Sequence, residues 1–159
     1  MPTIGRTLAT VKLGVHKTHD VCRASLRKNG INVCDWSGNT LTLKKVQLSQ
    51  TETDLELIGL SGTDLGFDEA TRRDIIHERI IERGFDLCPA EAAIMLRESY
   101  KTQPRGEWLV VAMEPLIGDH YPIVFGIDHY EDGLWLSTLY GYPHHRLNPG
   151  NMFVVARRK

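Results

Sequence analysis

Cys88 is the residue in this 159-residue chain whose position gives it the clearest route to chemistry. It stands in the run LCPAE, where Pro89 suits the first position of a helix and Glu91 the third, so Cys88 is predicted to be the N-cap. A thiol there faces unpaired backbone N–H groups and the positive end of the helix dipole, which lowers its pKa from about 8.5. Glu91 opposes this shift with its own charge. Cys88 is therefore either a reactive nucleophile or a half-buried structural cysteine.

Histidines in a late loop provide candidate bases and metal ligands. The loop of residues 141–150 reads GYPHHRLNPG and contains His144 and His145 between two prolines. Binding residues often lie in loops that a rigid sheet supports. A zinc site there would be chemically reasonable, but adjacent histidines on an extended backbone cannot easily face one metal, and a solvated loop is the alternative. We expect no metal and no cofactor.

A second group of polar residues indicates binding instead of catalysis. The helix predicted from Cys88 to about Lys101 places Arg97 and Tyr100 on one face, because residues three apart are neighbours on a helix. Gln103 lies in the turn that follows, and Trp108 near the start of the next strand. With Glu91 nearby and His144 and His145 as a rim, these side chains are predicted to bind a protein or a small polar partner.

The strand predicted from Glu107 adds one more candidate carboxylate. Its alternation puts Trp108, Val110, Ala112 and Glu114 on one face, and both faces are mostly apolar, which indicates a central strand. Glu114 is then either buried, with Arg97 as its partner, or exposed at the end of the strand.

Two function classes remain open on these residues. A non-catalytic binding or regulatory domain is favoured, because no complete set of nucleophile, base and orienting residue is present. The alternative is a cysteine-dependent hydrolase or transferase in which Cys88 attacks, a histidine such as His144 acts as base and helix N–H groups stabilise an oxyanion. A version that uses Glu91 and Glu114 for acid and base chemistry is weaker, because their separation is unknown.

The stretch from Leu87 to Pro115 carries a resemblance to a protein family. It combines LCPAE, then LR and Tyr100, then Gln103-Pro104, Gly106-Glu107-Trp108 and finally Ala112-Met113-Glu114-Pro115. This order resembles a recurring signature of uncharacterised bacterial proteins of about this length, and a weaker likeness extends over most of the chain. The resemblance implies that the stretch is a hallmark of that family and brings no activity or residue role with it.

Composition narrows the classes of partner. A net charge of −1, 42% apolar and 25% charged residues are ordinary for a globular domain, so nothing indicates nucleic acid or a membrane as partner. The three cysteines are widely spaced, which favours a reducing compartment. The chain shows neither a signal-peptide-like apolar run nor a stretch of about 20 apolar residues, so a cytoplasmic location is predicted.

The first part of the chain predicts alternating strands and a helix. A strand over 8–15 precedes a helix of about eleven residues that Thr18 caps and Asn29-Gly30 ends. Strands over 31–36 and 41–48, joined by a turn at 37–39, precede another over 55–60. The first helix is expected to direct Val21, Cys22 and Leu26 inward. His16, His19 and Asp20 cluster at its start, and a metal site or a proton relay formed by them is a further interpretation.

A second helix is predicted from an N-cap at Asp68 to Gly84, so that it forms a hairpin with the Cys88 helix. Such a hairpin is also found in proteins that recognise DNA. We do not expect DNA recognition here, because the later helix offers only Arg97 and Lys101 as basic residues. Strands over 123–127, 134–140 and 152–156 follow the central one, with a tight turn at 131–133.

Together these elements predict an α+β fold. Its sheet is expected to be mostly antiparallel, with a C-terminal meander of about four strands packed by the two later helices. One domain over 1–159 is predicted, with an N-terminal α/β portion over about 1–66, a helical hairpin over 67–102 and the meander over 107–156.

Overall fold

The computed structural model describes residues 4–33, 43–117 and 121–158. Its described strands are β1 (Arg6–Leu13), β2 (Asn32–Val33), β3 (Thr53–Ser61), β4 (Thr71–Arg72), β5 (Phe85–Asp86), β6 (Trp108–Val111), β7 (Leu116–Ile117), β8 (Pro122–Tyr130), β9 (Gly133–Tyr140), β10 (Arg146–Leu147) and β11 (Met152–Arg157). The helices are α1 (His19–Lys28), α3 (Arg73–Glu82) and α4 (Ala90–Ser99). The α+β class is therefore confirmed.

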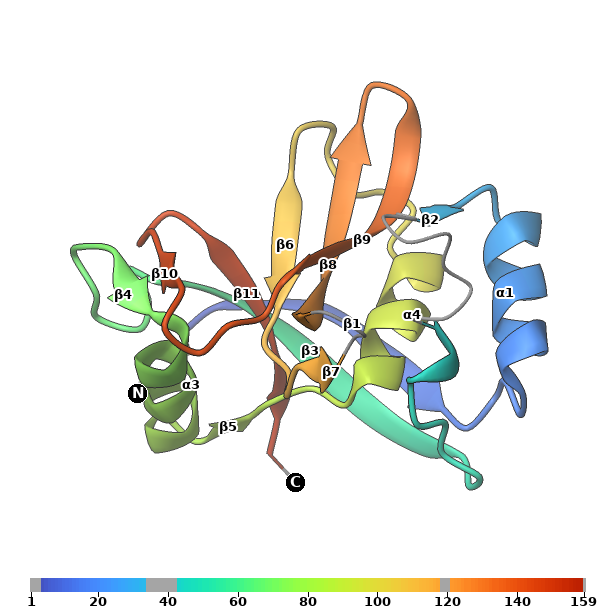
Figure 1. The fold of residues 1–159 in the computed structure, drawn as a ribbon, viewed down its shortest axis with the longest axis horizontal. Helices are drawn as coiled ribbons and strands as arrows, with labels where there is room; N and C mark the ends of the chain where they lie inside the picture. Colours follow the sequence, from blue (N-terminus) through green and yellow to red (C-terminus); the bar gives the residue numbers. More distant parts are fainter. Residues whose placement is uncertain (1–3, 34–42, 118–120, 159) are drawn as a thin grey trace.

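One curled, mixed sheet of nine strands runs through the described part of the molecule (Figure 1). Its main path is β1-β3-β11-β6-β8-β9-β2, with β5 beside β11 and β7 beside β8, and β10 pairs with β4 in a separate two-stranded sheet. The predicted C-terminal meander of about four strands is wrong, because its strands belong to this nine-stranded mixed sheet. β11 does not close an edge but lies between β3, to which it is antiparallel, and β6, to which it is parallel.

The physical reason for the central place of β11 lies in its run of apolar residues. Phe153 and Val155 pack on one face of the sheet, Val154 and Ala156 on the other, and all four are buried. A strand that is apolar on both faces has to be covered on both. β6 has the same character, as its alternation predicted, and lies between β11 and β8.

The two later helices lie on opposite faces of this sheet, so the predicted helical hairpin does not form (Figure 1). Ile76 and Ile80 of α3 pack with Val110, whereas Leu96 of α4 packs in the cluster on the other face. The two-residue strand β5 separates them and pairs with β11.

The start of α3 also differs from the prediction. Its N-cap is Arg72 and not Asp68, because Thr71 and Arg72 pair as a strand with β10 before the helix begins. The backbone N–H groups of Arg73 and Asp74 then donate to the carbonyl oxygens of His145 and Pro143, at 2.8 and 3.0 Å. The loop after β9 therefore satisfies the first free N–H groups of α3.

In the N-terminal part, the cap of α1 is confirmed, because the Val21 N–H donates to the Thr18 hydroxyl at 3.2 Å. Cys22 and Leu26 are buried as predicted, whereas Val21 is exposed. The strand predicted over 41–48 is wrong for its described residues, which begin with a helical turn at 43–44. Leu43 and Val46 are both buried, and that spacing of three suits a helical turn. The predicted turn at 37–39 lies outside the described residues.

Candidate functional site

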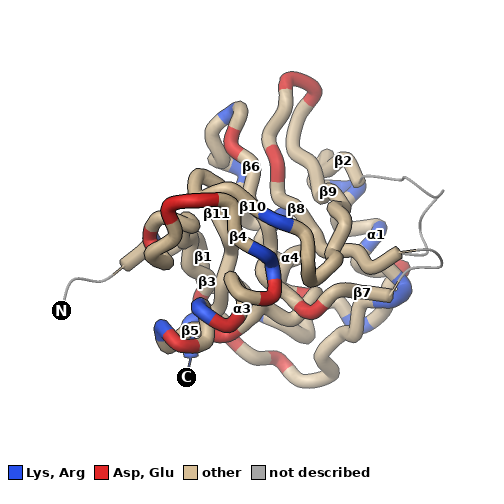
Figure 2. Tube along the Cα trace, turned by 60° about the vertical axis from the view of Figure 1, so that its left-hand side comes forward, with Lys and Arg blue, Asp and Glu red and all other residues tan. Residues whose placement is uncertain are grey.

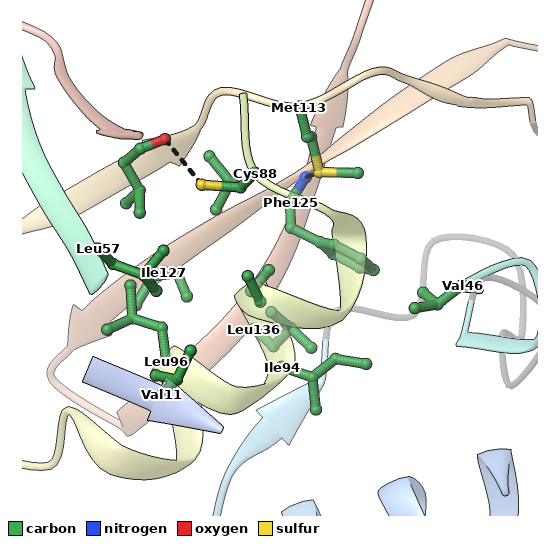
Figure 3. Close-up of a cluster of buried hydrophobic side chains, with 14 of the residues drawn as sticks. Val11, Val46, Leu57, Cys88, Ile94, Leu96, Met113, Phe125, Ile127 and Leu136 are labelled. Atoms are coloured by element: carbon green, nitrogen blue, oxygen red, sulfur yellow. Dashed lines mark hydrogen bonds between the residues drawn. The ribbon is translucent and has the colours of Figure 1, made fainter. Parts of the chain in front are cut away.

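Cys88 lies in the core between the sheet and α4 and is 4% exposed (Figure 3). It does not cap α4, whose N-cap is Pro89 and whose first turn has no side-chain cap. The Cys88 N–H donates to the Ala112 carbonyl at 2.8 Å, and the thiol to the Val154 carbonyl at 3.4 Å. These bonds hold Cys88 as an extension of the sheet, and its side chain points among apolar neighbours such as Met113.

This environment favours the structural interpretation of Cys88. Burial raises the pKa of its thiol, which is the opposite of what an activated thiolate needs. Among the described residues, no histidine nitrogen forms a hydrogen bond with its sulfur. His144, the expected base, is exposed in the loop between β9 and β10.

Arg97 is fully buried and forms the centre of a polar network inside the molecule. One guanidinium nitrogen donates to the Gln103 side-chain oxygen at 2.6 Å and to the Asp128 carbonyl at 3.0 Å. The second terminal nitrogen donates to the Tyr100 carbonyl at 2.6 Å, whereas Nε is buried without a partner among the described residues. Desolvation lowers the pKa of Arg97 to about 10. Arg97 thus does not pair with Glu114, and it has no free donor directed at solvent.

Gln103 completes the network. Its side-chain amide nitrogen donates to the Ile127 carbonyl at 2.9 Å, and its backbone carbonyl oxygen lies 2.6 Å from Nδ1 of His129. Next to it, the Tyr100 hydroxyl donates to Glu107 at 2.9 Å, and Glu107 pairs with Arg6 at 2.6 Å. The network therefore joins the end of α4 to β8 and β1.

Glu91 is a second buried polar residue with structural partners. It is 2% exposed, and its two carboxylate oxygens accept hydrogen bonds from the N–H groups of Gly14 and Ser49, at 2.9 and 2.8 Å. Gly14 has a φ of +80°, which an L side chain rarely adopts. Glu91 thus fixes two loops to the start of α4.

The residues predicted to form a binding surface therefore do not gather on one. Glu91, Arg97 and Gln103 are buried, whereas Trp108 is 45% exposed on the sheet. These three buried polar side chains are therefore part of the support of the fold.

The structure instead brings residues together in a cleft beside α3, here called the α3 cleft. It encloses about 360 Å³ between α3, the segment after β6 and the loop after β9. Its polar lining comprises Arg73, Asp74, His77, Glu78 and Glu114, and its apolar lining Ile81, Leu87, Pro115, Gly141 and Pro143. Figure 2 shows acidic and basic residues interspersed along α3 and β4.

Arg73 is the unusual residue of the α3 cleft. It is 2% exposed, and one guanidinium nitrogen donates to the Tyr140 carbonyl at 3.1 Å. Its Nε and its other terminal nitrogen are buried and have no hydrogen-bond partner among the described residues. Desolvation accordingly lowers the pKa of Arg73. Buried polar groups are normally paired, so these two nitrogens are unsatisfied among the described residues, as are Nε of Arg97 and two nitrogens of Arg23.

The neighbours of Arg73 differ in how they are engaged. Desolvation, followed by the nearby charge of Arg73, lowers the pKa of His77 to about 4, so its ring is neutral at pH 7. Asp74 is paired with Arg72 at 2.9 Å. Glu78 and Glu114 are exposed and form no ion pair with the described residues. Glu114 thus has the exposed position that was one of its two predicted alternatives.

Glu114 also borders a wider hollow of about 880 Å³. It shares Ile81, Leu87 and Pro115 with the α3 cleft, so these three residues line both hollows. Cys88 contributes to the wall of this hollow with its small exposed fraction.

The two predicted loop histidines do not line the α3 cleft. His144 and His145 line a cavity of about 430 Å³ together with Tyr121, Tyr140 and Tyr142. The Tyr142 and His144 rings are 5.4 Å apart. That this loop borders a binding site stays a prediction.

In the described part of the chain, no group of three or more His, Cys, Asp or Glu side chains is arranged to hold a metal ion. His16 lies 3.0 Å from Glu98, and His19 lies 2.7 Å from the Val46 carbonyl, so the two point to different partners. Among the described helices, none is long and apolar enough to cross a membrane.

Comparisons of the chain with protein-family models, with curated proteins and with solved structures gave no match.

Proposed function

We propose that the protein is a non-catalytic binding domain that takes up a small polar ligand with an anionic group in the α3 cleft. The observation that carries the proposal is the guanidinium of Arg73, which is 2% exposed and leaves two nitrogens unpaired among the described residues while it lines a cavity. An unsatisfied buried donor costs about 1–3 kcal/mol, and more when it is charged. A ligand carboxylate or phosphate that accepts from these nitrogens would recover that cost on binding.

The size of the α3 cleft suits a small molecule. Its volume of about 360 Å³ is at the lower end of the range of about 300–1,000 Å³ for ligand pockets. Apolar side chains with a few polar groups form its wall, which is the usual composition of a binding site. Among the described residues that line it, there is no serine, threonine or cysteine, and the unsatisfied nitrogens of Arg73 favour binding as the proposal.

The test is a titration with simple anions. Acetate, 3-methylbutanoate and inorganic phosphate would be added to the labelled protein, and the amide and arginine side-chain resonances would be followed by NMR. Saturable shifts at Arg73, His77 and Ile81 are expected for at least one anion, and Arg73→Met should abolish them. Arg72→Met is the matched control, because Arg72 is adjacent but paired with Asp74. Shifts that persist in Arg73→Met, or a lack of shifts with every anion even at high anion concentration, would contradict the proposal.

A further inference from the structure

We infer that the ligand of the α3 cleft is a zwitterion, namely a free α-amino acid with an apolar side chain. This inference rests on the proposed function and adds the chemical class of the ligand. It comes from the opposite charges that line one small cavity: the guanidinium of Arg73, of which two nitrogens have no partner among the described residues, and the carboxylates of Glu78 and Glu114.

The two carboxylates are exposed and are not held in an ion pair by the described part of the chain. Neither Glu78 nor Glu114 forms an ion pair there, whereas the third carboxylate of the cleft, Asp74, is occupied by Arg72 at 2.9 Å. His77 does not supply a positive charge at neutral pH, since its pKa lies at about 4. Arg73 is therefore the single cation among the described residues of the α3 cleft.

This charge pattern discriminates between ligands. A simple anion would gain from Arg73 but would be repelled by Glu78 and Glu114 within the same small cavity. A cation without a carboxylate would gain from the glutamates but would leave the buried Arg73 nitrogens unpaired. A molecule with one carboxylate and one ammonium group satisfies both sides, and an α-amino acid is the smallest common molecule of that kind.

The remaining wall of the cleft favours an apolar side chain on this ligand. Its apolar lining includes Ile81, Leu87 and Pro115. Ile81 is exposed although it is a large apolar residue. Covering such a side chain with an aliphatic or aromatic group removes apolar surface from water, at about 25 cal/mol for each Å².

The experiment compares three matched probes by calorimetry with the full chain. L-Leucine carries both charges, 4-methylpentanoate lacks the ammonium group, and L-leucinamide lacks the carboxylate; the phenylalanine set of L-phenylalanine, 3-phenylpropanoate and L-phenylalaninamide is run in parallel. In at least one set, the amino acid should bind at least tenfold more tightly than either of its matched probes. Glu114→Gln should reduce the affinity for the amino acid several-fold and leave that for the acid unchanged or higher. Glu131→Gln, at the tip of the β8–β9 hairpin, should change neither.

The outcomes separate the inference from the proposed function. If the acids bind as tightly as the amino acids and lose this affinity in Arg73→Met, the zwitterion is wrong and the anion-binding function stands. If the amides bind as tightly as the amino acids, the need for a carboxylate is wrong, and both claims fail. If no probe of either set binds, the inference is likewise overturned, and the simple anions of the preceding test then decide the function on their own.

Discussion

The Arg97 guanidinium donates a 2.6 Å hydrogen bond to the side-chain oxygen of Gln103, and neither side chain reaches solvent. The bond connects the last turn of α4 with the turn before β6, and Gln103 in turn binds the Ile127 carbonyl of β8. The most polar part of the stretch from Leu87 to Pro115 thus orders the backbone around the sheet.

Replacing Arg97 should therefore destabilise the fold. Arg97→Ala leaves Gln103 and several buried carbonyl groups without a donor, and we expect a loss of about 3–5 kcal/mol of unfolding free energy. Arg97→Lys should recover only part of it, because an ammonium group cannot reproduce the planar fork of a guanidinium. Urea unfolding measures the effect, with Arg27→Lys on the exposed side of α1 as control. A loss below about 1 kcal/mol for Arg97→Ala would show that the network contributes little.

The carboxylate of Glu91 should matter for two loops at once. Glu91→Gln keeps one acceptor oxygen for either Gly14 or Ser49 and turns the other position into a donor, which faces a backbone N–H. We expect a loss of about 2–3 kcal/mol, because a hydrogen bond to a charged group contributes about 1.5–3 kcal/mol. Hydrogen exchange should accelerate at the Gly14 and Ser49 amides in particular. The control, Glu82→Gln at the exposed end of α3, should change stability by less than about 0.5 kcal/mol.

Local signals in the sequence predicted local structure well. The Thr18 cap, the end of α1 at Asn29 and the tight turn of the β8–β9 hairpin follow from the chemistry of neighbouring residues, and the structure confirms them. The central place of β6 also followed from its two apolar faces. The same reasoning applied to residues 153–156 would have placed β11 in the interior of the sheet.

Long-range pairings explain what the sequence did not reveal. Thr71 and Arg72 form a strand because residues 146–147, far along the chain, lie beside them, and this moves the start of α3. Cys88 became part of the core because its N–H binds Ala112 across the sheet. Arg73 was not among the predicted site residues, and its burial involves the distant end of β9, where its guanidinium donates to the Tyr140 carbonyl. Its flanking isoleucines, Ile76 and Ile80, were the available signal that this face of the helix turns inward.

Cys88 should be unreactive in the folded protein. Its thiol is 4% exposed and its pKa is raised by burial, and burial raises the pKa of Cys22 to about 11. In a Cys34→Ser background, a thiol reagent at pH 8 should modify neither residue until denaturant is added, when both should react. Rapid modification of Cys88 in the native state would contradict the buried geometry and revive the nucleophile hypothesis.

Stability should fall between pH 6.5 and pH 4 because of His77. Its folded-state pKa of about 4 lies below the ordinary value of 6.5, so the unfolded chain takes up the proton first as the pH falls. The stability contributed by the neutral ring is complete above about pH 6.5 and is lost as the pH decreases to about 4, on the order of 2–3 kcal/mol. Urea unfolding at each pH should show a flatter profile for His77→Gln than for the control His144→Gln in the exposed loop. Equal profiles would mean that His77 titrates normally.

Arg73→Met tests whether the guanidinium in the α3 cleft serves binding or folding. Methionine fills a similar space without a buried charge, so unfolding free energy should stay unchanged or rise by up to about 2 kcal/mol, as replacement of uncompensated buried polar groups can stabilise a protein. The pKa of His77 should rise from about 4, because the charge of Arg73 is one of the two causes that lower it. NMR titration of the His77 ring and urea unfolding measure both effects, and Arg72→Met should leave the His77 pKa unchanged. A stability loss above about 2 kcal/mol with an unchanged His77 pKa would instead assign Arg73 to the support of the fold, and the α3 cleft would lose its binding group.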